Sequence, residues 1–120
     1  MDESLVVEKF HGSLDTQRVL RLSGPLTFET LSPLQNALRV ETASSVFLDL
    51  SDVPYVDSAG LGSLVTACVS CNKTGRQFVL SGVQPRVERL FRITGVEHLF
   101  IIFPSIQDAL DALTRPAEST

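Results

Sequence analysis

Short apolar runs alternate with amphipathic stretches along most of the chain, and this alternation is the feature that most limits its fold. From the second run onward, each run is followed by a stretch in which apolar residues recur with helical spacing. Strands that alternate with helices predict a largely parallel sheet with right-handed crossovers. The expected strands are Leu5–Phe10, Arg18–Leu22, Val46–Leu50, Gln77–Leu80 and Phe100–Ile102.

The stretches between these runs predict four helices. The first is capped either by Ser32, with Pro33 in its first turn, or by Thr27 in an earlier, irregular turn. Glycines that follow the second and third helices are typical stop signals. The other helices are expected from near Asp57 to Gly75, over Val83–Thr94, and from Ser105 to Leu113.

The expected fold is therefore a single α/β domain over residues 1–113, with a mixed, mostly parallel five-stranded sheet and four helices. The first two strands are expected to pair antiparallel at one edge, and the very apolar Val46–Leu50 to lie in the centre. A chain of 120 residues is long enough for one domain with one core. Residues 114–120 have the composition of a flexible C-terminal tail.

Charge and hydropathy exclude several functional classes. The net charge of −4 argues against direct binding of nucleic acid by the whole domain. The longest apolar run, Leu99–Phe103, is far shorter than the roughly 20 residues that cross a bilayer. The acidic start, Met1-Asp2-Glu3, lacks the form of a signal peptide. A cytoplasmic protein without membrane contact is expected.

Cysteine and histidine give little support to a redox or metal centre. Cys68 and Cys71 form a Cys-x-x-Cys pair, but they lie well inside the second expected helix. Redox pairs gain reactivity at a helix N-terminus, so buried, reduced thiols are the favoured interpretation. His11 and His98 are not at metal-binding spacing, and no cofactor or metal is expected.

The sequence also lacks the motifs of common enzymes. Ser58 is not in a Gly-x-Ser-x-Gly motif, and no phosphate-binding glycine loop of the standard spacing is present. Asp49, Asp52 and Asp57 follow one strand and could hold Mg²⁺, although a short polar loop explains them equally well. We expect a protein that is not an enzyme.

The most unusual segment is Asp57–Gly62, with the sequence Asp-Ser-Ala-Gly-Leu-Gly. It joins the loop after a buried strand to a helix N-terminus, where open α/β sheets place their binding sites. A helix N-terminus also favours an anion, so a phosphate on Ser58 would be well placed. The plainer alternative is that Asp57 or Ser58 only caps the helix. Two glycines, each costing about 1 kcal/mol relative to alanine, indicate that something approaches the helix backbone closely.

A second surface feature is the basic stripe formed by Arg86, Arg89 and Arg92, which recur every third residue. The favoured interpretation is a solvated helix face paired with Glu88 and Glu97. The alternative is a docking patch for an acidic partner.

Around these residues the sequence resembles the STAS domain family, and more specifically the bacterial anti-sigma factor antagonists. The resemblance covers the chain from Leu5 to Leu113 and implies the family's mixed sheet with four helices. One position departs from it, because many members have Asp where this chain has Thr27 in Gly24-Pro25-Leu26-Thr27. The motifs that carry it are Val46–Gly62, Gly75-Arg76, Phe78–Val83, Val87-x-x-Leu90-Phe91 and Thr94-Gly95.

The resemblance implies a phosphorylation switch, because the family's regulated serine falls on Ser58. In its unphosphorylated form such a protein binds an anti-sigma factor, which is also a serine kinase, and thereby frees the sigma factor. The kinase then phosphorylates the serine and releases the antagonist, and a phosphatase resets it. The alternative is a STAS adaptor that is not phosphorylated, or a ligand-sensing module in a larger complex.

The partner surface is expected to combine two loops that follow neighbouring strands, because the carboxyl ends of parallel strands meet at one rim. An exposed Leu61 or Phe28 would serve as its apolar anchor. The expected contact residues are Pro25, Thr27, Phe28, Asp57, Ser58, Ala59, Gly60, Leu61 and Ser63.

Overall fold

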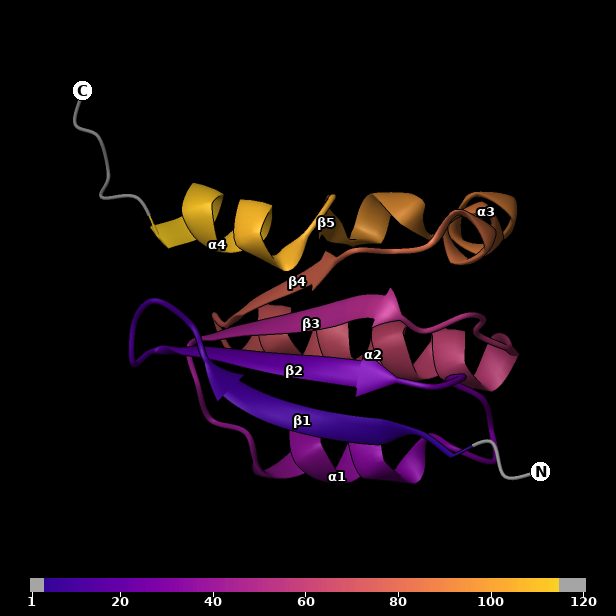
Figure 1. The fold of residues 1–120 in the computed structure, drawn as a ribbon, viewed down its shortest axis with the longest axis horizontal. Helices are drawn as coiled ribbons and strands as arrows, with labels where there is room; N and C mark the ends of the chain where they lie inside the picture. Colours follow the sequence, from indigo (N-terminus) through magenta and orange to yellow (C-terminus); the bar gives the residue numbers. More distant parts are fainter. Residues whose placement is uncertain (1–3, 115–120) are drawn as a thin grey trace.

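The computed structural model describes residues 4–114, which form the expected mixed five-stranded sheet (Figure 1). The first two strands pair antiparallel at one edge, the other pairings are parallel, and the third strand is central, all as predicted. In spatial order, the strands are β1 (Val6–His11), β2 (Gln17–Ser23), β3 (Ser45–Asp52), β4 (Gln77–Ser81) and β5 (Ile101–Phe103).

Four α-helices connect and follow these strands, and the described residues also form one short 3₁₀ helix, Glu97–Leu99. Thr114, which was assigned to the tail, is the last residue of α4 and accepts a hydrogen bond from Gln17. The other tail residues lie outside the described part of the chain. The α-helices are α1 (Ser32–Val40), α2 (Ser58–Lys73), α3 (Pro85–Thr94) and α4 (Ile106–Thr114).

Two helix starts differ from the prediction. The cap position of α1 is Leu31, without a side-chain hydrogen bond, so neither Ser32 nor Thr27 caps it, although Pro33 does lie in the first turn. The third helix begins at Pro85 rather than Val83, because Pro suits a first helical turn and the preceding segment is extended.

The helices divide unequally between the two faces of the sheet. Alternation along each strand sends apolar side chains to both faces. Leu20 and Leu48 belong to a large core with α1, α2 and α3, whereas Phe47 packs on the opposite face with α4. Figure 1 shows that β2, β3 and β4 point the same way, and that α2 and α3 begin at their carboxyl ends. No helix in residues 4–114 is long and apolar enough to span a membrane.

The two cysteines lie on the buried side of α2, each with 4% of its surface exposed. Both are free thiols, as predicted, and the Cys68 thiol donates to the carbonyl of Leu99 at 3.3 Å. Burial raises the pKa of both thiols, because the thiolate loses its hydration. This environment suppresses the thiolate that redox chemistry requires.

Candidate functional site

Asp57 is the residue that caps the N-terminus of α2. Its backbone is extended, and its Oδ1 accepts a hydrogen bond of 2.8 Å from the backbone N–H of Gly60. The first N–H groups of a helix have no partner within the helix, so this bond fixes where α2 begins. The Gly60 N–H is also the main reason that the pKa of the Asp57 carboxyl lies below its usual value.

The same carboxylate ties the helix to the loop that follows β2. Its Oδ2 accepts a hydrogen bond of 3.0 Å from the backbone N–H of Phe28. Backbone bonds reinforce the junction: Leu26 N–H donates to Tyr55 at 3.1 Å, and Asp57 N–H donates to Leu26 at 3.2 Å. The structure therefore brings the two predicted loops together at one rim.

A threonine that sequence reasoning missed shapes the loop after β2. The Thr30 hydroxyl donates to the carbonyl of Pro25 at 2.7 Å and accepts from the backbone N–H of Thr27 at 2.8 Å. The Thr27 hydroxyl lies 3.3 Å from the same oxygen. The position that departs from the family pattern is thus part of a turn organised by Thr30. The only sequence signal for this role is a threonine in a predicted loop, since threonine hydroxyls often bond nearby backbone groups in turns.

The two glycines at the start of α2 have different surroundings. Gly60 is buried, and a Cβ added there would lie 2.2 Å from the carbonyl oxygen of Leu26. The close approach expected from the sequence is therefore made, at Gly60, by this chain's own loop. Gly62 is exposed, and an added Cβ would have no neighbour within 4 Å among the described residues.

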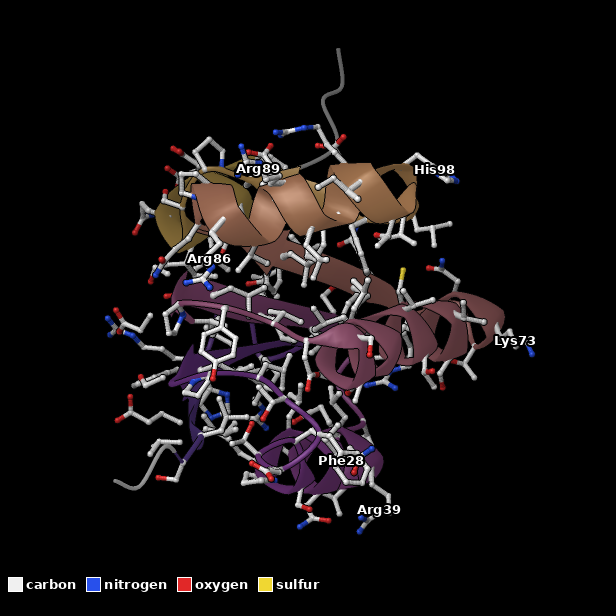
Figure 2. The ribbon with its side chains drawn as sticks, turned by 90° about the vertical axis from the view of Figure 1, so that its right-hand side faces the viewer. Phe28, Arg39, Lys73, Arg86, Arg89 and His98 are labelled. Carbon is white, nitrogen blue, oxygen red and sulfur yellow. The ribbon has the colours of Figure 1, made fainter. Side chains whose placement is uncertain are left out.

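Exposure separates the predicted contact residues into two groups. Ser58 is exposed as the first residue of α2, and its hydroxyl makes no hydrogen bond with any other residue in the range 4–114. Phe28 is 76% exposed and lies in the lower part of the side shown in Figure 2. The expectation of an exposed Leu61 is wrong, because Leu61 is only 8% exposed and faces the core. Pro25 and Gly60 are also buried, so they support the two loops from below and are not available for contact with a partner.

A hollow of about 360 Å³ lies between the two loops. Its two charged side chains, Glu29 and Asp57, are both acidic. Tyr55, which sequence reasoning did not single out, forms part of the wall. Its only sequence signal is its position two residues before the helix cap, which does not reveal these contacts. The lining residues are Thr27, Phe28, Glu29, Thr30, Tyr55 and Asp57.

Comparison with known proteins gives this fold a family. A family model described as the STAS domain matches residues 7–109. The chain belongs to the STAS domain family. An anti-sigma-B factor antagonist from Staphylococcus aureus is 31% identical over 102 residues, which is 81% of this chain and 86% of that protein.

Solved STAS structures agree with the fold. An anti-sigma factor antagonist from Mycobacterium paratuberculosis superposes with a TM-score of 0.75 at 21% identity, covering 92% of this chain and 95% of the other. A sulfate transporter family protein from Wolinella succinogenes gives 0.72 at 29% identity, covering 81% and 84%. Both confirm the single α/β STAS domain predicted from the sequence.

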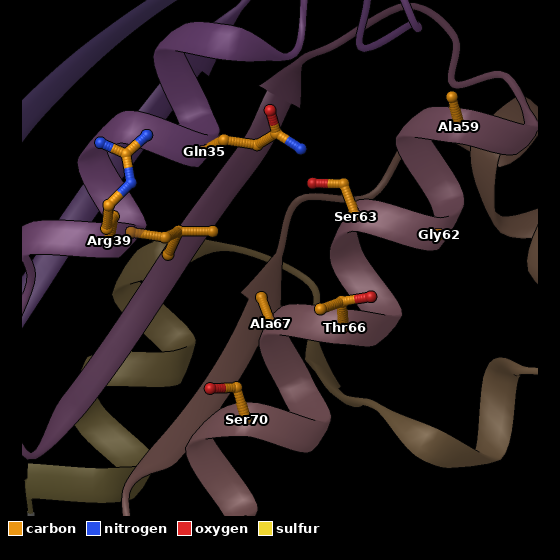
Figure 3. Close-up of a pocket in the computed structure, with 9 residues that line it drawn as sticks. Gln35, Arg39, Ala59, Gly62, Ser63, Thr66, Ala67 and Ser70 are labelled. Carbon is orange, nitrogen blue, oxygen red and sulfur yellow. The ribbon is translucent and has the colours of Figure 1, made fainter.

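This STAS domain also has an open groove of about 500 Å³ between α1 and α2 (Figure 3). Ala59 and Ser63, which were predicted to share one surface with the two loops, line this groove instead. Figure 3 shows Ser63 extending towards Gln35 on α1. The groove is lined by Gln35, Leu38, Arg39, Ala59, Gly62, Ser63, Thr66, Ala67 and Ser70.

The three carboxylates considered for Mg²⁺ do not converge on one point. Arg21 lies 3.5 Å from Asp52 and 4.0 Å from Asp49, so an arginine occupies the place of a cation. Asp49 also accepts bonds from the backbone and hydroxyl of Ser51. Among residues 4–114, no group of three His, Cys, Asp or Glu side chains is arranged to hold a metal ion.

Proposed function

We propose that this STAS domain is an anti-sigma factor antagonist. In its unphosphorylated form it binds an anti-sigma factor that is also a serine kinase, and a sigma factor is thereby freed. The observation that carries the proposal is the exposed Ser58 hydroxyl at the start of α2, beside a loop that the Asp57 carboxylate holds in place. The Staphylococcus aureus relative, an anti-sigma-B factor antagonist, supports it.

The partner surface centres on Phe28. An aromatic side chain that is 76% exposed gains most from being removed from water in a complex. Thr27 and Asp57 surround it with polar groups, as is common around an interface anchor. Ala59 and Ser63 extend the surface into the groove beside α1.

Phosphorylation of Ser58 switches this binding off. The kinase transfers the γ-phosphoryl group of ATP to the Ser58 oxygen, which releases ADP and the hydroxyl proton. A phosphatase later hydrolyses the ester with water, which restores the hydroxyl and releases inorganic phosphate. The phosphate adds close to two negative charges and considerable bulk. The phosphate lies next to Asp57, whose carboxylate already accepts a hydrogen bond from the N–H of Gly60. The N-terminus of α2 therefore has fewer free N–H groups left to stabilise the phosphate. A close-packed partner would have to bury an unpaired charge, which costs several kcal/mol.

The test uses the purified domain and the serine-kinase anti-sigma factors encoded in the same genome. Calorimetry should show tight binding of the unmodified domain to one of them. Addition of ATP should then add one phosphate by intact mass and abolish binding. Ser58→Ala should bind but take up no phosphate. The control Ser44→Ala, at an exposed serine directly before β3 and so at the opposite end of the strands, should both bind and take up phosphate. Phosphate uptake by Ser58→Ala would place the modified hydroxyl elsewhere, and unchanged binding by Ser58→Asp would contradict a charge switch.

The second candidate function is a STAS adaptor or ligand-sensing module that is not phosphorylated. It is favoured by the 29% identity to the sulfate transporter family protein and by Thr27 at the position where many antagonists have Asp. This function predicts no phosphate uptake with any of the kinases, and no anti-sigma factor among the proteins that bind the domain.

A further inference from the structure

The basic stripe on α3 divides into two parts in the structure. Arg92 lies 3.7 Å from Glu88, so one of the predicted surface pairs is present. Arg86 lies over the ring of Tyr55, 5.4 Å from its centre. Arg89 is exposed and makes no ion pair with any residue between 4 and 114. Figure 2 shows Arg86 and Arg89 on the same side of the molecule as Phe28.

Arg86 and Arg89 border a hollow of about 300 Å³ between α3 and the segment before α2. The walls also include Ile93, which is 74% exposed. The spacing of Arg86, Arg89 and Ile93 places them on one helix face, so an exposed apolar side chain lies beside two cations. The lining residues, none of which is acidic, are Tyr55, Val56, Arg86, Arg89, Leu90 and Ile93.

Tyr55 separates this basic hollow from the acidic hollow beside Phe28, because it lines both. The charged groups of the acidic hollow are Glu29 and Asp57, and those of the basic hollow are Arg86 and Arg89. The rim is therefore charge-polarised, in a chain whose net charge is −4. A concentration of unpaired positive charge on an acidic protein indicates a place that attracts acidic groups.

We propose that the basic hollow on α3 binds an acidic segment of a protein partner, with one apolar side chain packed against Leu90 and Ile93. Arginine suits this role, because its planar guanidinium can hold a carboxylate through two parallel hydrogen bonds. The inference extends the proposed function and rests on it for the identity of the partner, the anti-sigma factor. The polarised rim then fixes the orientation of that partner, because an acidic segment is repelled by Glu29 and Asp57.

A polyanion such as RNA or DNA fits this surface less well than an acidic peptide. Nucleic-acid binding draws on many phosphate contacts along a basic surface. Here the two arginines are followed, on the other side of Tyr55, by two carboxylates. The apolar side chains of Leu90 and Ile93 also make no favourable contact with a nucleic-acid backbone, whereas a leucine side chain of a peptide would pack against them.

The first test needs no anti-sigma factor. A short capped peptide with one leucine flanked by Asp and Glu is titrated into the ¹⁵N-labelled domain, and amide shifts are followed by NMR. Shifts should concentrate at Arg86–Ile93, weaken when the leucine is replaced by glycine, and largely vanish at higher ionic strength. A peptide with Lys in place of the acids should cause none. Absence of shifts on α3, or equal shifts from a single-stranded oligonucleotide, would overturn the proposal.

The second test uses the anti-sigma factor that binds the domain. Arg89→Glu should lower its affinity about tenfold at low salt. The matched control Arg92→Glu makes the same charge change on the same helix but outside the hollow, and should change the affinity less than about twofold. Equal losses for both variants, or none for Arg89→Glu, would overturn the α3 assignment while leaving the anti-sigma antagonist function intact. If no anti-sigma factor binds the wild type, that function fails, and the peptide titration still decides the role of α3.

Discussion

The two sides of helix α2 differ in what their small residues do. On the buried side, Gly60 lies against the chain's own Leu26 carbonyl, and Leu64, Cys68 and Cys71 continue into the core. On the exposed side, Gly62 faces open space in the groove beside α1. The same residue type, two positions apart, is thus required by the fold in one case and by nothing in the described chain in the other. A glycine such as Gly62, which the fold does not require, is one whose small size a binding partner could require.

The largest expected difference between the two sides is in thiol reactivity. Cys68 and Cys71 react only when the helix opens, because burial excludes reagents and raises their pKa. Their labelling should be about a thousandfold slower in the native protein than in denaturant. Ser70→Cys is the matched control, since Ser70 is exposed next to Cys71, and it should label rapidly. Native labelling of all three thiols at one rate would remove the distinction between the sides.

The second largest effect is expected for Gly60→Ala. The new methyl group would have to displace the Leu26 carbonyl, which lies 2.2 Å from the ideal Cβ position. Such overpacking costs about 1–3 kcal/mol, and the helix preference of alanine offsets only part of it. Urea unfolding should therefore give a lower midpoint than that of the wild type. An unchanged midpoint would mean that the loop yields easily and that Gly60 is not needed for the fold.

Much of the fold could be predicted because the hydrophobic patterns of strands and helices are both strong in this sequence. Val46–Leu50 is apolar at every position except Asp49, as is typical of a strand covered on both faces, and the apolar positions of α2 recur with helical spacing. Helix starts were harder. The cap of α1 is Leu31, which carries no polar signal, and the preceding turn is organised by the local hydrogen bonds of Thr30.

The candidate site was predictable in position but not in orientation. Asp57 and Ser58 were found because capping chemistry is local and visible in sequence. Leu61 was assigned to the surface because it stands in an unusual motif, yet helical geometry turns it into the core. The role of Tyr55 depends on contacts with segments distant in the sequence, such as the one that carries Arg86, and one sequence alone does not reveal such contacts. The bonds of Thr30 to Pro25 and Thr27 are local, but the loop between two expected elements gave no periodic pattern that would single this hydroxyl out.

A third, smaller effect is expected at Asp57, which connects the start of α2 to the loop after β2. Asp57→Ala removes the helix cap and the bond to Phe28, and should lower the unfolding free energy by about 1 kcal/mol. Asp57→Asn keeps a capping oxygen and should lose less. Because the folded pKa of Asp57 is lowered, its charge stabilises the protein above the unfolded pKa of about 3.9, and this contribution is lost as pH falls through the folded pKa. Wild type and Asp57→Asn should converge in stability on acidification; a constant gap would exclude the charge as the cause.

The smallest expected effect has the opposite sign. Gly62→Ala adds a methyl group that meets nothing within 4 Å in the described structure, and alanine is the better helix former. The unfolding free energy should rise by about 0.5–1 kcal/mol, where Gly60→Ala lowers it. If Gly62 is kept small for a partner that approaches the groove, the more stable variant should bind the anti-sigma factor less tightly, because the methyl group holds the partner away from the α2 backbone. A variant that gains stability and keeps full affinity would show that the partner contacts the Phe28 rim alone, and that the groove beside α1 stays open in the complex.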